Sequence, residues 1–102
     1  MFIYLKNLTK IDVENFDTSN VTEMFDMFYY CTNLAEIDVS NRNTSNVTNM
    51  GQMFANSKNI TKLNVSKWNT SKVTNMSNLF NSLEKLTELD VSNFDTSRVT
   101  DM

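Results

Sequence analysis

The sequence predicts an α/β solenoid of about four 26-residue repeats, with one parallel β-sheet on one side and short helical turns on the other. Three observations support this fold class. Similar segments begin at Leu8, Leu34, Ile60 and Leu86, always 26 residues apart and without insertion. Each begins with apolar residues at the period of a strand, and later carries apolar residues at the spacing of a helix. A fixed period of this length is typical of repeats that bury their apolar faces against their neighbours.

The 102 residues are predicted to form one repeat domain. It comprises a partial repeat at 1–7, complete repeats at 8–33, 34–59 and 60–85, and a partial repeat at 86–102. Neither end has the polar cap that a stack of repeats needs, so we expect residues 1–102 to be a segment of a longer array. Uncapped ends expose an unpaired strand and part of the apolar layer, which predicts self-association through the ends.

A strand is predicted near the start of each repeat. In the first repeat, Leu8, Ile11 and Val13 are apolar, whereas Lys10 and Asp12 on either side of Ile11 are charged. Alternation with a period of two is typical of a strand with one buried face. Each repeat therefore donates one predicted strand to the parallel sheet.

A turn is predicted next, because short polar side chains follow the strand. The first repeat reads Asn-Phe-Asp-Thr-Ser at residues 15–19, and the whole chain has one Gly and no Pro. Asn, Asp, Ser and Thr side chains are therefore expected to satisfy the backbone groups of the turn. A brief extended segment is expected after it, around Val21 and Met24.

Helical turns are predicted at the end of each repeat. Met24, Met27, Phe28 and Cys31 are spaced i, i+3, i+4, i+7, which places them on one side of a helix. We assign the methionines in these positions to the core, where thioethers fill irregular gaps. Cys31, the one cysteine of the chain, is expected to be a buried and inert thiol.

Residues 26 apart would lie about 5 Å from each other across a parallel sheet, so each position of the repeat becomes a row. We call the outward row of alternating sign the charged row; it consists of Lys10, Glu36, Lys62 and Glu88. One interpretation is that opposite charges on neighbouring strands fix the register. The other is that these charges form a partner-binding face, because outward strand positions of repeat proteins commonly do so.

A second outward row, called the Asp row, consists of Asp12, Asp38, Asn64 and Asp90. Its neighbouring like charges need compensation. A cation is one candidate, but calcium needs about six to eight oxygens, more than a flat row of single carboxylates supplies. Hydrogen bonds from nearby Ser, Thr or backbone groups are the favoured explanation, and no metal site is predicted.

A row of mostly aromatic residues follows at the turn, and it contains Phe16, Arg42, Trp68 and Phe94. These residues either fill the core or anchor a ligand. Arg42 favours partial exposure of the row, because burying an unpaired guanidinium is very costly. If a peptide or carbohydrate is recognised, Arg42 and Trp68 are the candidate anchors. The candidate partner-binding face itself consists of Lys10, Asp12, Glu14, Glu36, Asp38, Lys62, Asn64, Glu88 and Asp90.

Composition excludes several function classes. The chain has no His to act as an imidazole base, and a single Gly does not build a phosphate-binding loop, so neither an enzyme nor a cofactor is predicted. The net charge is −3 and the nine Lys and Arg are scattered among acids, so no nucleic-acid partner is expected. No stretch approaches the roughly 18 apolar residues that cross a bilayer, so this segment is not expected to insert into a membrane.

The repeat as a whole resembles a known family. The pattern L-x-x-L-D-V-S-N-F-D-T-S-x-V-T-x-M, followed by M-F, is similar to the 26-residue repeat of BspA-like bacterial surface proteins, which is related to leucine-rich repeats. Arg42, Asn64 and Gly51 depart from this pattern. The resemblance implies a leucine-rich-repeat-like solenoid, display on the cell surface or outside the cell, and non-catalytic roles in adhesion.

Two functions from different classes follow. The first is a non-catalytic bacterial cell-surface module that binds a protein or glycan on a cell surface. The second is a structural spacer that displays another domain. The recurrence of Ser40, Ser66 and Ser92 at one outward position favours the spacer, because specific recognition would prefer diversity.

Overall fold

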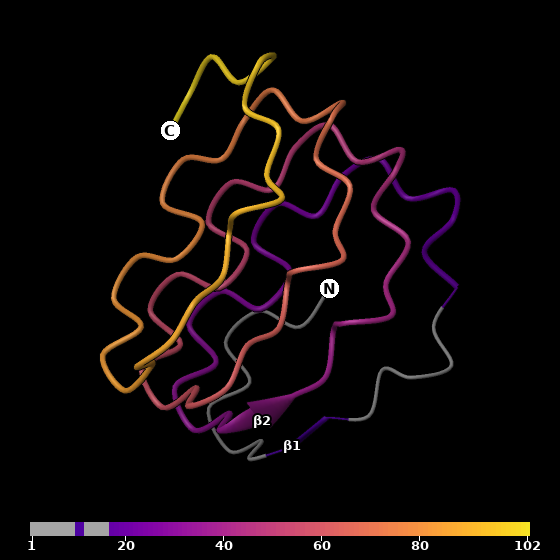
Figure 1. Cartoon of the computed structure of the whole chain (residues 1–102). Coiled ribbons are helices and arrows are strands. Elements are labelled where there is room, and N and C mark those ends of the chain that lie inside the picture. The colour runs from indigo at the N-terminus through magenta and orange to yellow at the C-terminus, as the bar shows by residue number, and fades with distance from the viewer. Residues whose placement is uncertain (1–9, 12–16) are drawn as a thin grey trace.

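The chain winds through successive coils that lie side by side, in a computed structural model that describes residues 10–11 and 17–102 (Figure 1). Backbone hydrogen bonds join each coil to the next. The N–H of Met24 donates to the carbonyl oxygen of Asn49 at 2.8 Å. The N–H of Met50 donates to the carbonyl oxygen of Asn75 at 2.9 Å. Each repeat is therefore bonded through its backbone to the repeat that follows it in sequence.

Strands in the described residues are confined to two short parallel segments. β1 (Lys10–Ile11) pairs with β2 (Glu36–Ile37), with Lys10 opposite Glu36 and Ile11 opposite Ile37. Isolated parallel bridges connect other repeats: Glu36 with Lys62, Glu23 with Asn49, Asn49 with Asn75, and Asn75 with Asp101. All of these partners are 26 residues apart in the sequence, so the described repeats pair in the register that the sequence predicts.

The prediction of an α/β leucine-rich-repeat-like solenoid is wrong. The described residues contain no helix, and the two-residue strands β1 and β2 stand where a sheet with one strand from each repeat was expected. The chain instead forms a compact stack of turns. Its radius of gyration is 12.5 Å, close to the roughly 13 Å of a globular domain of 100 residues. Accordingly, the described part of the chain offers no helix able to cross a membrane.

The segments predicted to be helical form tight turns because their N–H groups bond elsewhere. The N–H of Phe28 donates to the carbonyl oxygen of Met53 in the next repeat at 2.7 Å, whereas an α-helix needs that N–H for the residue four positions earlier. Left-handed residues also end a right-handed helix. Positive φ occurs at Asp26 (58°), Tyr30 (59°), Gln52 (55°), Asn56 (62°), Asn78 (53°) and Ser82 (60°). The helix-like spacing of apolar residues is thus produced by consecutive turns.

β2 is short because turns lie close to both of its ends. Before β2, the N–H of Leu34 donates to the carbonyl oxygen of Cys31 at 3.0 Å. After β2, the N–H of Ser40 donates to Oδ1 of Asp38 at 3.0 Å. A side chain that accepts a bond from the backbone two residues later bends the chain into an Asx turn. Asp38 therefore ends the strand that the alternation of the sequence predicts.

Apolar residues of the second and third repeats form most of the core, at the positions that the sequence predicts to face inward. Phe28 and Phe54 are buried and stack with ring centroids 5.5 Å apart. Cys31 is buried, as expected. Of the methionines assigned to the core, Met27 is partly buried against it. The others are fully inside: Met24, Met50, Met53 and Met76.

Buried threonines make a second connection between repeats. Oγ1 of Thr44 donates to the carbonyl oxygen of Asn69 at 3.0 Å, and the N–H of Asn69 donates back to Oγ1 at 2.9 Å. The expected local bond is present beside it, because the N–H of Ser45 donates to Oδ1 of Asn43 at 3.0 Å. The turn residues therefore form hydrogen bonds with backbone groups of their own turn and also with backbone groups of the next repeat.

Candidate functional site

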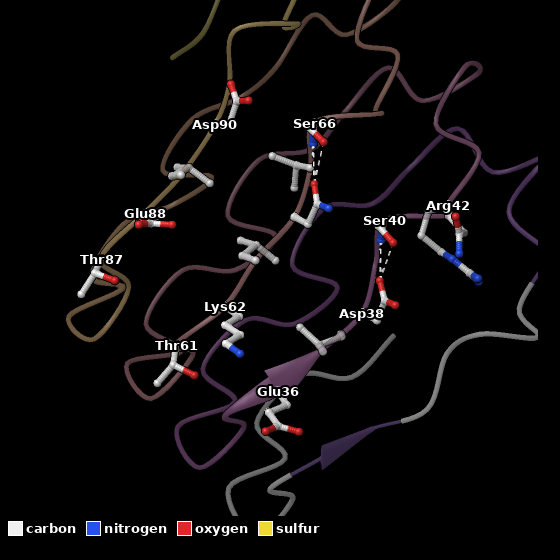
Figure 2. A pocket seen from close by; sticks show the side chains of 16 residues that line it. Glu36, Asp38, Ser40, Arg42, Thr61, Lys62, Ser66, Thr87, Glu88 and Asp90 are labelled. Atoms are coloured by element: carbon white, nitrogen blue, oxygen red, sulfur yellow. Dashed lines mark hydrogen bonds between the residues drawn. The ribbon is translucent and has the colours of Figure 1, made fainter.

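An open groove of about 1100 Å³ runs across the strand side of the second, third and fourth repeats (Figure 2). The same positions of each repeat line it, because the repeats are in register. Figure 2 shows Glu36, Lys62 and Glu88 following one another along the groove. The exposed polar residues of the lining are Glu36, Asp38, Asn41, Thr61, Lys62, Asn64, Thr87, Glu88 and Asp90. Most of the candidate partner-binding face therefore lies together on one surface.

The described positions of the charged row are in register with one another. Glu36 pairs with Lys10 in β1 and bridges Lys62 on its other side. Lys62 nevertheless forms no ion pair with a carboxylate of the described residues, in contrast to Lys58, which lies 3.3 Å from a carboxylate oxygen of Glu84. Its ammonium thus remains exposed to a partner in the groove.

The described members of the Asp row, Asp38, Asn64 and Asp90, accept the local hydrogen bonds that the sequence predicts. Oδ1 of Asp38 accepts from the hydroxyl of Ser40 at 2.6 Å as well as from its N–H. Oδ1 of Asn64 accepts the same two bonds from Ser66, at 2.7 Å and 3.1 Å. Both residues are exposed at the surface of the groove. The row therefore needs no cation to hold its turns.

These bonds also set the charge state of the row. The hydroxyl and the N–H of Ser40 hold the pKa of Asp38 below its ordinary value, and Ser92 does the same for the pKa of Asp90. Both groups accept hydrogen bonds in their charged form, which favours that form. Asp38 and Asp90 accordingly present negative charge along the groove.

The two candidate anchors lie in different environments. Arg42 is partly exposed and lines the groove. Trp68 is 2% exposed, and its Nε1–H donates to the carbonyl oxygen of Val39 at 2.9 Å. Its ring also stacks on Phe54 with centroids 6.2 Å apart. Trp68 therefore packs in the core, where its indole N–H is hydrogen-bonded. Of the two candidate anchors, Arg42 alone lines the groove.

Two predicted residues of the face lie outside the described residues. These are Asp12 and Glu14. Sequence reasoning in turn missed Thr61 and Thr87, which are exposed and line the groove beside Lys62 and Glu88. The sequence signal that could have identified them is their position: each immediately precedes a residue of the charged row, and the two lie 26 residues apart.

The groove is suited to hydrogen bonding and ion pairing. Its lining contains carboxylates, hydroxyls, the ammonium group of Lys62 and the guanidinium group of Arg42. No group of three or more His, Cys, Asp or Glu side chains in the described part of the chain is arranged to hold a metal ion. The groove places no nucleophile beside an imidazole base, because the chain has no His.

Comparison with known proteins gives one match. Residues 1–102 match the model of a family described as "Mycoplasma protein of unknown function, DUF285". No curated protein and no solved structure matches the chain. The match covers the full repeat region, and its description names neither BspA-like proteins nor leucine-rich repeats.

Proposed function

We propose a function from the premise that the chain belongs to the bacterial family described as "Mycoplasma protein of unknown function, DUF285". The chain is a non-catalytic module of the bacterial cell surface that binds a protein or glycan through its groove. The observation that carries this proposal is the gathering of exposed polar positions from three repeats along one groove. A surface of charged and hydroxyl groups can recognise a partner by complementary charge and hydrogen bonds.

The placement at the cell surface rests on the sequence. The repeat resembles that of BspA-like surface proteins, which is our reason to expect display outside the cell and a role in adhesion. The absence of His and the single Gly support a non-catalytic role.

The binding proposal is tested by screening the 102-residue chain against glycans and bacterial or host surface proteins. A bound partner should be lost when Lys62→Glu reverses the exposed ammonium in the groove. Lys85→Glu is the matched control, because Lys85 is an exposed lysine that does not line the groove. Thermal unfolding of both variants should remain close to that of the native chain, because exposed substitutions usually change stability by less than about 0.5 kcal/mol.

The alternative is a structural spacer. Ser40, Ser66 and Ser92 repeat one side chain at one position, as expected for a uniform surface. A spacer predicts no partner in the screen at any concentration tested. It also predicts that Lys62→Glu and Lys85→Glu behave alike in every binding assay.

A further inference from the structure

The charged row reads the same when it is reversed and its signs are exchanged. Its order along the repeats is positive, negative, positive, negative. A second row running in the opposite direction therefore places an opposite charge against every member. This property makes the row complementary to itself under a two-fold rotation, which is the symmetry of the commonest protein dimers.

The members of the charged row in the second, third and fourth repeats lie at the surface. Glu36, Lys62 and Glu88 are exposed and line the open groove (Figure 2). Lys62 forms no ion pair with a carboxylate in the described part of the chain. The bridge between Glu36 and Lys62 fixes the two positions on adjacent strand segments, which lie about 4.8 Å apart in a parallel pair.

We propose that the partner recognised by this groove is a second copy of the same chain, docked face to face. The inference rests on the proposed function, because it uses the same surface. A two-fold axis passes between Glu36 and Lys62, so that Glu36 of each copy meets Lys62 of the other. The same rotation brings Glu88 of one copy to the Lys10 position of the other, which is the strand residue opposite Glu36.

The contact is small and polar, so the dimer belongs to the weak and transient class of complexes. Its charge pairs are also exposed at their edges, where salt screens them. The dimer should therefore form at high protein concentration in dilute salt, and it should dissociate as salt is added. These two properties separate it from association through the apolar end of the stack, which salt does not weaken.

Sedimentation of charge-reversed variants tests the pairing. The native chain should shift with concentration from 11.8 kDa toward twice that mass. Glu36→Lys and Lys62→Glu each place like charges together twice per dimer, so each alone should weaken self-association by at least about tenfold. An equimolar mixture of the two variants should associate again, because one copy then carries two glutamates and the other two lysines. The double variant E36K/K62E should associate with itself.

If the single variants failed to associate because they fold poorly, mixing them would not restore association. Thermal unfolding of each variant checks its folding directly. Lys85→Glu is the control and should dimerise like the native chain. Dimers that survive both single reversals, or a mixture that stays monomeric, would overturn the proposal. A native chain that stays monomeric in dilute salt also overturns it, whereas a protein or glycan that binds this monomer keeps the proposed function standing.

Discussion

Individual carboxylates in this chain respond to their surroundings in opposite directions. Burial raises the pKa of Asp26, and its Oδ1 is buried without a hydrogen-bond partner. Hydrogen bonds from Ser40 instead lower the pKa of Asp38. The two residues therefore have opposite effects on stability as the pH changes.

Replacing Asp26 by Asn should stabilise the chain at neutral pH. A folded-state pKa above the unfolded value means that the folded state is favoured at low pH, and that this contribution is lost as the pH rises through the folded pKa. The variant removes the charge and keeps a side chain suited to positive φ, since Asn78 occupies the equivalent position with φ 53°. Thermal unfolding at pH 7 should show a rise in Tm on the order of 2–4 °C. The rise should vanish in acid, and a rise that persists there would contradict this account.

Replacing Asp38 by Asn should make the chain less sensitive to acid. Because its folded pKa is lowered, its contribution is present above the ordinary value of 3.8 and is lost as the pH falls below that value. Asn64 already makes the same two bonds to Ser66, so the variant should equal the native chain near pH 7. Denaturant unfolding across the acidic range measures the stability of the two chains. If the unfolding free energy of both chains fell in parallel with pH, the prediction would be refuted.

Among the elements, the turns connect the repeats more than the strands do. Thr44 exchanges two hydrogen bonds with Asn69 across the repeat boundary. Thr70 exchanges the same two bonds with Asp95, at 3.1 Å and 2.8 Å. Both threonines are buried, so losing either hydroxyl leaves partly buried backbone groups without a partner.

Thr44→Val should therefore reduce the free energy of unfolding by about 1–3 kcal/mol. Thr96→Val is the matched control, because Thr96 holds the same position in the last repeat and is exposed. The control should change stability by less than about 0.5 kcal/mol. Denaturant unfolding of both variants measures these changes. Equal losses of unfolding free energy in the two variants would show that the bonds across the repeat boundary do not stabilise the chain.

The sequence predicts which residues face inward but not how the backbone carries them there. The buried Met24, Phe28 and Cys31 follow directly from their spacing. The same spacing is satisfied by a helix or by consecutive turns, and only contacts with the next repeat decide between them. The N–H of Phe28 bonds to that repeat, and no pattern within one repeat reports such a bond. For this reason the core was predictable and the helices were wrong.

The positions that line the groove were predictable for a related reason. Outward positions such as Glu36 and Lys62 need only the register, which the 26-residue period supplies. Trp68 was harder to place, because an aromatic residue fits both a core and a binding surface. Its burial depends on a carbonyl oxygen, that of Val39, contributed by the preceding repeat.

The whole molecule is a stack whose last repeat is less covered than the others. Leu89 and Val91 are 37% and 42% exposed, whereas the equivalent Leu63 and Val65 are 7% and 1% exposed. Each repeat thus depends on the next one to cover its apolar residues. Stability in such a stack is approximately a sum of terms for each repeat and for each contact between neighbours.

Extending the stack in register should raise its thermal stability. A copy of residues 77–102 added after Met102 completes the fourth repeat and covers Leu89 and Val91. Each additional kcal/mol should raise Tm by roughly 4–8 °C for a domain of this size. A scrambled extension of the same composition is the control. An extended chain that melts with the control would contradict stabilisation by neighbouring repeats.

The central claim is that the coils are joined in the 26-residue register, because the groove, its rows and the proposed dimer all depend on it. Scalar couplings through hydrogen bonds, measured by NMR, test this register most directly. The amide nitrogens of Met50 and Phe54 should couple to the carbonyl carbons of Asn75 and Leu79, whose oxygens accept their bonds at 2.9 Å and 3.2 Å. Couplings to carbonyl carbons four residues earlier in the chain would indicate helices instead and would contradict the account.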